Sequence, residues 1–308
     1  MGPKIFSKQK GDTLYSLRLL PIGGFCDMDG ETEDSGSETS FNNKPIWKRM
    51  IIVATGAILN IILGIILMSI VLVQMDLLPT VTISQFAEES KTEEYGLIVG
   101  DTIVSIDGYD IFTEKDLSFA YGTADPSSVD ITVNRDGELI EFNGLSLGSD
   151  EYDGVEYVSL DFYVYGEEPT FVNIIKKSFA DSYSIFRMVL ASLGGIISGE
   201  FGLNEVSGPV GATKAISDAA AVGLESSFFD GLSNIIFMMA VLTINLGVFN
   251  LLPFPALDGG RFVFLLIELI FRKKVPAKYE NIINTLGFVI LISFMIVITF
   301  KDIFQIFF

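Results

Sequence analysis

One apolar stretch of the chain contains residues that could do chemistry. Residues 250–260 read Asn-Leu-Leu-Pro-Phe-Pro-Ala-Leu-Asp-Gly-Gly, which places the carboxylate of Asp258 inside a segment hydrophobic enough to lie in a membrane. A carboxylate at that depth is costly unless it is paired, protonated or bound to a metal, so Asp258 is predicted to mark a functional site. The structural alternative is a helix-breaking Asp-Gly turn. For Asn250 and Asn60 the alternative is that each amide joins two helices by a hydrogen bond.

The residues that could complete a metal site around Asp258 are few. The chain has no histidine and a single cysteine, Cys26. With one cysteine it can form no intramolecular disulfide. Catalytic zinc takes three protein ligands and a water molecule, so one carboxylate cannot hold it. We therefore expect the 308 residues alone to bind no metal cofactor.

Long apolar segments must position this stretch. Nearly half of the residues are hydrophobic, and the mean hydropathy is positive, so several segments must leave water. The apolar residues are concentrated at 50–73, 235–252 and 282–300, and each segment predicts a membrane crossing. The first is long enough to cross alone and the third is just long enough. Two prolines, Asp258 and two glycines interrupt the second crossing before residues 262–271 continue it, so we expect it to be discontinuous.

Charge is concentrated in one part of the chain. Residues 76–169 contain 22 acidic and 3 basic residues, a net charge of −19 that equals the net charge of the whole chain. This acidity excludes nucleic acid and anionic lipid head groups as partners of the segment. Basic residues cluster at positions 44–49 and 272–278, and the positive-inside rule makes both clusters cytoplasmic. The acidic segment and the C-terminus are then predicted to lie outside the cell.

The N-terminal segment alternates polar and apolar residues. Residues 4–25 end in Pro21-Ile22-Gly23-Gly24-Phe25, a pattern that predicts a short β-hairpin with a turn at 21–24. One interpretation is a surface hairpin, and the other is a strand edge that pairs with an extended peptide beside the membrane. Residues 27–43 are rich in Gly, Ser, Thr, Asp and Glu and predict a loop.

The acidic segment has the alternation of β-structure. Strands are predicted at residues 80–86, 102–106, 129–134, 139–142 and 156–163, with a helix at 113–121. Gly96 and Leu97 begin a run that resembles the G-L-x-x-G-D-x-I-x-x-I-x-G signature of PDZ domains. The resemblance implies a domain that binds extended peptides, with Gly96 and Leu97 at the binding site. Another small β-rich domain is the alternative.

Between the acidic segment and the second crossing, residues 171–197 carry apolar side chains at helical period. The sequence leaves open whether this helix lies on the outer membrane surface or packs on the other helices. Ser207-Gly208-Pro209-Val210-Gly211 then predicts a turn.

The order of these motifs resembles that of the site-2 proteases, and more narrowly that of bacterial RseP-type intramembrane zinc metalloproteases. The resemblance covers essentially the whole chain, and its most specific motif is N-x-x-P-x-P-x-L-D-G. It implies that Asp258 is a zinc ligand and that Asn250, Pro253 and Pro255 shape the substrate groove. It also implies regulated intramembrane proteolysis, in which zinc-bound water attacks a peptide bond of a single-pass membrane protein. Ala57 departs from the family pattern, where proline usually follows the glycine, and should change helix packing.

The larger departure is the absence of the H-E-x-x-H helix that relatives carry before Gly2-Pro3-Lys4. It would supply two histidine ligands and the glutamate general base. We expect this chain to be the C-terminal portion of such a protease, inactive by itself, with the missing helix encoded upstream. One alternative is a catalytically inactive membrane PDZ protein that binds exported peptides. Another is that a second polypeptide supplies the helix.

The expected fold is a multi-pass α-helical membrane protein with an inserted extracytoplasmic, β-rich, PDZ-like domain, of α+β class, in the bacterial plasma membrane. Its partners would be membrane lipid, single-pass membrane substrates and a peptide at the PDZ-like domain, with no nucleic acid. Six segments are predicted in chain order: a cytoplasmic hairpin and loop at 1–49, a transmembrane helix at 50–75, the PDZ-like domain at 76–168, an amphipathic helix and connection at 169–227, the discontinuous crossing at 228–271, and a basic loop with the last transmembrane helix at 272–308.

Overall fold

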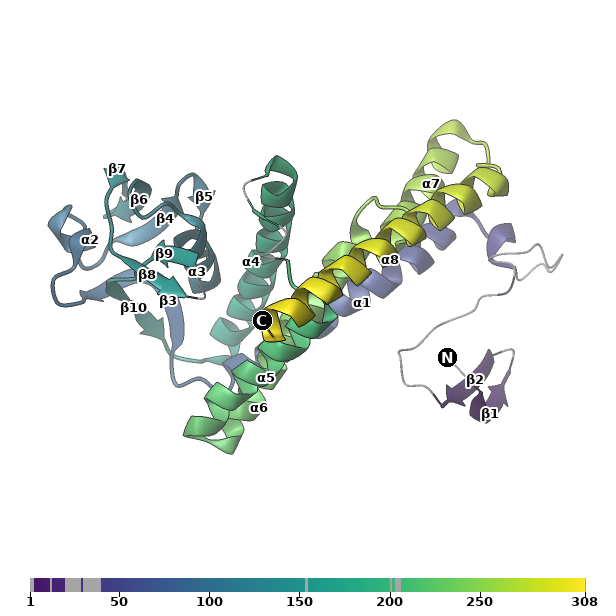
Figure 1. Ribbon diagram of the computed structural model, residues 1–308, viewed down its shortest axis with the longest axis horizontal. Helices are drawn as coiled ribbons and strands as arrows, with labels where there is room; N and C mark the ends of the chain where they lie inside the picture. The colour runs from purple at the N-terminus through teal and green to yellow at the C-terminus, as the bar shows by residue number, and fades with distance from the viewer. Residues whose placement is uncertain are drawn as a thin grey trace. The chain divides into compact units, whose positions relative to one another are not determined.

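The computed structural model describes residues 3–11, 13–19, 29, 40–152, 155–199, 201–202 and 206–307. The chain divides into two compact units, Met1–Ile52 and Val53–Phe308 (Figure 1). The predicted turn at 21–24, Cys26 and most of the predicted loop at 27–43 lie outside the described residues.

The first unit contains a β-hairpin within the segment where one was predicted. Strands β1 (Lys4–Lys10) and β2 (Thr13–Arg18) pair in antiparallel register, with Lys8 opposite Tyr15. A short 3-10 helix, η1 (Phe41–Asn43), ends the predicted loop and precedes the first turns of α1 (Ile46–Leu72). A hairpin is therefore present in this segment, but its turn lies between Lys10 and Thr13 and was not predicted, because the Pro-Ile-Gly-Gly sequence was taken as the turn. Use of the hairpin as an edge for a peptide remains a prediction.

Three helices in the described part of the chain are long and apolar enough to cross a membrane: α1, α6 (Phe228–Leu251) and α8 (Ala277–Phe307). These are the three predicted apolar segments. A shorter helix, α7 (Asp258–Phe271), follows α6 after the break. Helices α1 and α6 pack closely, because a Cβ placed on Gly64 would lie 2.3 Å from Ile244 Cγ1.

The acidic segment folds into a β-rich part (Figure 1). This part has its own apolar core. A six-stranded antiparallel sheet runs in the order β10-β3-β4-β6-β7, with β5 added beside β4, and β8 and β9 form a separate pair. The elements are β3 (Leu78–Phe86), α2 (Lys91–Glu94), β4 (Thr102–Ile106), β5 (Tyr109–Asp110), α3 (Glu114–Thr123), β6 (Val129–Arg135), β7 (Glu138–Leu145), β8 (Ser149–Tyr152), β9 (Val155–Val158) and β10 (Phe162–Glu167).

One strand prediction in this part is wrong. Residues 156–163 were expected to form a single strand but divide into the end of β9 and the start of β10. The polar groups between them bond elsewhere: Ser159 N–H donates to the Gly148 carbonyl, and the Asp161 carboxylate accepts from Thr92 N–H at 2.9 Å. The β-rich part is confirmed, whereas its identity as a PDZ domain remains a prediction.

Helix α4 (Phe171–Ser198) packs on the other helices. Its Ile174 and Ile185 belong to the same buried cluster as Met68 on α1 and Ile244 on α6. Of the two positions that the sequence left open for this helix, packing against the helices is therefore the one observed.

Helix α5 (Pro209–Ser226) begins where the sequence predicted only a turn. The Asp302 carboxylate of α8 accepts from Gly208 N–H at 2.9 Å and from Gly211 N–H at 2.8 Å, and so satisfies the free N–H groups at the start of α5. The prediction failed because this alanine- and glycine-rich segment has no clear apolar stripe, although proline at the first helical position fits a helix start.

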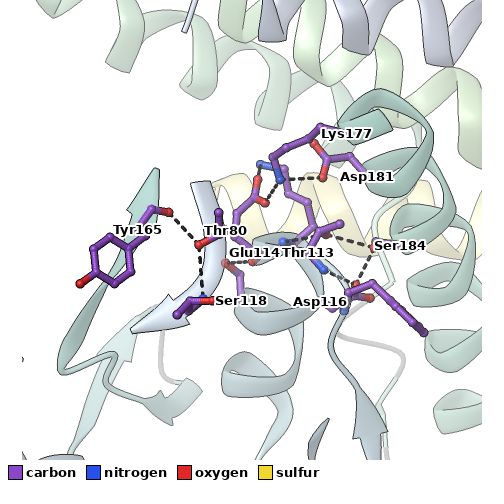
Figure 2. Close-up of polar contacts among 12 residues, drawn as sticks. Thr80, Thr113, Glu114, Asp116, Ser118, Tyr165, Lys177, Asp181 and Ser184 are labelled. Carbon is purple, nitrogen blue, oxygen red and sulfur yellow. Dashed lines mark hydrogen bonds and ion pairs between the residues drawn. The ribbon is translucent and has the colours of Figure 1, made fainter. Parts of the chain in front are cut away.

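A buried polar junction joins the β-rich part to α4 (Figure 2). Asp116 on α3 is fully buried, and its carboxylate accepts from Thr113 N–H at 3.0 Å and from the Ser184 hydroxyl of α4. Beside it, Lys177 of α4 pairs with Glu114 of α3 and, at 3.1 Å, with Asp181. The two parts are therefore held together by charged groups that lie away from water.

Asp181 makes this junction sensitive to pH. Burial, reinforced by the nearby Glu114 carboxylate, raises the pKa of Asp181 to about 6, although Lys177 opposes the shift. A carboxyl whose pKa is raised by folding adds stability that is present at low pH and is lost as the pH rises through the folded-state value. Between pH 5 and pH 7 the junction should therefore weaken as Asp181 loses its proton.

We predict that Asp181→Asn will gain stability relative to the parent as the pH rises, by about 1 kcal/mol between pH 5 and pH 7, because asparagine carries no charge to bury. Thermal unfolding in detergent at several pH values measures this difference. The exposed Asp218 of α5 provides the control, since Asp218→Asn should follow the parent at every pH. A constant difference between Asp181→Asn and the parent across this range would contradict the assignment.

Candidate functional site

Asp258 is the first residue of α7, directly after the break in the second apolar segment. Helix α6 ends at Leu251 and its capping residue Leu252 is extended. Prolines at 253 and 255 cannot donate backbone hydrogen bonds, and each disfavours helical geometry in the residue before it. The sequence therefore stops one helix and starts another at Asp258, whose side chain is half-buried.

Two glycines allow the start of α7 to pack on the connection that precedes it. A Cβ placed on Gly259 would lie 2.1 Å from the Leu252 carbonyl oxygen, and one on Gly260 would lie 2.3 Å from the Phe254 carbonyl oxygen. Both contacts are with backbone, which cannot move aside as a flexible side chain would. Gly259 and Gly260 are therefore required by the fold of this turn, and the turn fixes the position of Asp258.

Helix α1 passes beside the Asp258 carboxylate. A Cβ placed on Gly56 would lie 3.4 Å from Asp258 Oδ2. Close by along α1, a Cβ on Gly247 of α6 would lie 2.9 Å from the Ala57 carbonyl oxygen. Ala57, the departure from the family pattern, is thus a buried contact between α1 and α6.

The structure brings one group of predicted site residues together. Asn250 lies in the last turn of α6 and is half-buried, Pro253 is exposed on the connection, and Pro255 is half-buried. Pro255 packs on α8, because a Cβ placed on Gly287 would lie 2.5 Å from Pro255 Cβ. Asn250, Pro253, Pro255 and Asp258 therefore share one helix connection, while their roles remain predictions.

Gly96 and Leu97 lie apart from this group, between α2 and β4 in the β-rich part. Gly96 has a positive φ of 99°, which favours glycine, and the Leu97 side chain is buried in the core. The loop bonds internally: Ile98 N–H donates to Asp101 Oδ2, and Arg135 donates to both Asp101 and the Gly96 carbonyl. Although burial raises the pKa of Asp101, the hydrogen bonds from Arg135 and Ile98 bring it below the ordinary value.

The ligands near Asp258 do not make up a zinc site. In the ranges that the structure describes, no group of three or more His, Cys, Asp or Glu side chains could hold a metal ion. The whole sequence contains no histidine. Since catalytic zinc takes three protein ligands and water, these residues can offer Asp258 as one ligand and not a complete site.

A hollow of about 610 Å³ adjoins Asp258. Its walls come from the start of α7 and from one face of α8. The lining residues are Ala256, Leu257, Asp258, Arg261, Asn281, Asn284, Thr285 and Phe288.

Sequence reasoning missed Arg261 and the α8 residues of this hollow. Asn284 Oδ1 accepts from Ala256 N–H at 3.2 Å and so ties α8 to the connection before Asp258. The available signal was the pair of amides at the start of the last predicted crossing, Asn281 directly before residues 282–300 and Asn284 within them. Polar side chains in such a helix usually face a partner or a cavity.

Comparison with known proteins identifies the family. The sequence profile of peptidase family M50 matches residues 1–294. The zinc metalloprotease RasP of Shouchella clausii is 28% identical over an alignment of 397 positions, which covers 100% of this chain and 90% of that protein. A Clostridium perfringens protein with a provisional name as a zinc metalloprotease is 34% identical over 304 positions, covering 98% of this chain and 87% of its own length. A similarly named protein of Fusobacterium nucleatum is 31% identical over 320 positions, which cover 100% of this chain and 88% of that protein.

The chain belongs to peptidase family M50, the site-2 protease family. The resemblance stated from the motifs is therefore confirmed. The chain with three apolar helices and a glycine-packed turn at Asp258 thus belongs to a family in which the relatives named above are called zinc metalloproteases.

Proposed function

We propose that this chain is part of a multi-pass membrane zinc metalloendopeptidase that carries out regulated intramembrane proteolysis of single-pass membrane proteins. The observation that carries the proposal is the presentation of Asp258. Its carboxylate starts a helix on a turn that only glycine permits, beside α1 and at the edge of a hollow. An ionisable side chain held in this way between apolar helices marks a functional site by default.

In this proposal Asp258 supplies one metal ligand, and Asn250, Pro253 and Pro255 shape the groove that receives the substrate. The 308 residues contain no histidine, and we propose that two histidine ligands and the general base are supplied from outside them. An H-E-x-x-H helix has the required donors, with two histidines one turn apart and a glutamate between them.

The β-rich part is proposed to be a PDZ-like domain on the extracytoplasmic side of the bacterial plasma membrane. Its acidity and the two basic clusters at 44–49 and 272–278 support this orientation by the positive-inside rule. There it would bind a peptide near Gly96 and Leu97, or screen substrates by size before they enter the site. Helices α1, α6 and α8 would make the crossings in contact with lipid.

The proposal is tested by joining a membrane helix with H-E-x-x-H in front of Met1 and measuring cleavage of a single-span membrane protein in liposomes. We predict cleavage by the extended chain with zinc and none by the 308-residue chain alone. The control carries alanine in place of the glutamate, which should keep zinc but lose the general base. Equal cleavage by the extended chain and the glutamate control would contradict the proposed chemistry, as would no cleavage by either.

A further inference from the structure

The hollow beside Asp258 has a wall on α8 that no motif identified. Four of its lining residues, Asn281, Asn284, Thr285 and Phe288, are spaced at i, i+3, i+4 and i+7 and so share one helix face. The opposite face carries apolar side chains, among them Ile283 and Ile290, which are 38% and 58% exposed. Helix α8 therefore has an apolar side suited to lipid and a polar side that meets the hollow.

Asn284 anchors this polar face to the site. Its Oδ1 accepts from Ala256 N–H, and Ala256 has a positive φ of 73°, a strained conformation for a residue with a side chain. Three residues further along α8, Gly287 lies against Pro255 so closely that a Cβ would meet the Pro255 carbonyl oxygen at 2.7 Å. Helix α8 thus fixes the connection that leads into Asp258, and Asn284 is a positioning residue.

Asn281 and Thr285 lie on either side of Asn284 on this face, and both are exposed. Asparagine offers a carbonyl acceptor and two N–H donors, and threonine offers a hydroxyl that donates and accepts. Phe288, 58% exposed, adds an aromatic surface at one end of the row. Together they provide hydrogen bonds for peptide groups and an apolar contact for a side chain.

An unwound membrane segment needs these interactions. A membrane helix satisfies its own backbone groups, but a segment that has been opened for cleavage exposes N–H and C=O groups where no water can bond them. Each such group costs free energy unless a protein group replaces the lost hydrogen bond. A row of amide and hydroxyl groups beside Asp258 meets this requirement and also explains why α8 carries polar residues at this position.

We propose that Asn281 and Thr285 bind the backbone of an extended, apolar peptide segment in the hollow, with Phe288 contacting one of its side chains. The inference deepens the proposed function, because it names α8 as the second wall of the substrate groove opposite Asp258. It specifies the ligand by its chemistry: a membrane-spanning peptide that has left the helical conformation.

The test is photo-cross-linking from α8 in the full 308-residue chain in lipid nanodiscs. A photoreactive amino acid is placed singly at Asn281, Thr285, Ile283 or Ile290. The probe is a leucine-rich single-span peptide of about 24 residues with lysines at both ends and a central Gly-Gly pair that favours unwinding. A matched peptide with Ala-Ala in place of Gly-Gly remains helical.

We expect Asn281 and Thr285 to cross-link the Gly-Gly peptide several times more strongly than Ile283 and Ile290 do, and more strongly than they cross-link the Ala-Ala peptide. Equal labelling from both faces, equal labelling of both peptides, or no labelling from Asn281 and Thr285 would overturn the inference. Because this assay requires no zinc, its failure is distinguishable from failure of the proposed proteolysis.

Substitution provides a second measurement. Asn281→Leu and Thr285→Val should each weaken binding of the Gly-Gly peptide about fivefold, the effect of one lost hydrogen bond. Ile290→Leu on the opposite face is the matched control and should leave the affinity unchanged. An unchanged affinity in both polar-face variants would also refute the proposed contacts.

Discussion

Replacing Asp258 with alanine is expected to abolish proteolysis by the chain extended with an H-E-x-x-H helix. The reason is that Asp258 is the only metal ligand we assign to the 308 residues, and zinc held by two histidines alone lacks its third protein ligand. Loss of even a group that only supports a ligand costs about 10- to 100-fold, so loss of the ligand itself should exceed about 100-fold. The measurement is the initial rate of cleavage of a single-span substrate at saturating zinc.

Two further variants distinguish the loss of a metal ligand from nonspecific effects of a substitution. Asp258→Asn keeps the size of the side chain but removes its charge, and it should also lose most of the activity. Asp218→Ala removes an exposed carboxylate on α5 and should cleave at the parent rate. If Asp258→Ala retained more than about a tenth of the parent rate, Asp258 could not be a required ligand.

The second large effect is expected at Gly259, where alanine should disrupt the turn that presents Asp258. The added Cβ would lie 2.1 Å from the Leu252 carbonyl oxygen and 2.5 Å from that of Leu251, so the α6–α7 connection must shift. Overpacking that forces backbone movement costs about 1–3 kcal/mol of stability and occasionally more. We expect Gly259→Ala to destabilise the chain by an amount at the upper end of this range. The extended chain should lose both thermal stability and cleavage activity.

Gly194 of α4 provides a matched control for this substitution. Gly194 is exposed, and apart from the backbone of its own helix no atom lies within 4 Å of the position that a Cβ would take. Alanine there should stabilise the chain by about 0.5–1 kcal/mol, since alanine favours the helix more than glycine does. The two Gly→Ala substitutions are thus predicted to have opposite signs. A Gly259→Ala variant that melts at or above the parent temperature would contradict the packing described for the turn.

The features that could be predicted from sequence are those set by local composition. Hydropathy located α1, α6 and α8, because a membrane crossing is a long, nearly uninterrupted apolar run. Pro253 and Pro255 predicted the break before Asp258, because proline in a helix interior removes a backbone hydrogen bond and clashes with the preceding turn. Alternation predicted most strands of the β-rich part, where one face of the sheet is buried.

The features that could not be predicted depend on residues far apart in the chain. Asp302 caps the start of α5 from more than 90 residues away, so a segment without an apolar stripe becomes a helix through a tertiary contact. Asp116 on α3 likewise accepts from Ser184 on α4, and neither residue type signals such a pairing. At the candidate site, Asn284 was missed because its contact with Ala256 requires knowing that α8 returns beside the connection.

Zinc content is the most direct test of the central claim that Asp258 is one ligand of a metal site completed by residues outside these 308. Purified parent chain, chain extended with H-E-x-x-H, and the extended Asp258→Ala variant are dialysed against buffered zinc and analysed by atomic emission. The account predicts about one tightly held zinc per extended chain, none in the parent chain and a weakened site in the variant. One tightly held zinc in the 308-residue chain alone, or undiminished zinc affinity in the extended Asp258→Ala variant, would contradict it.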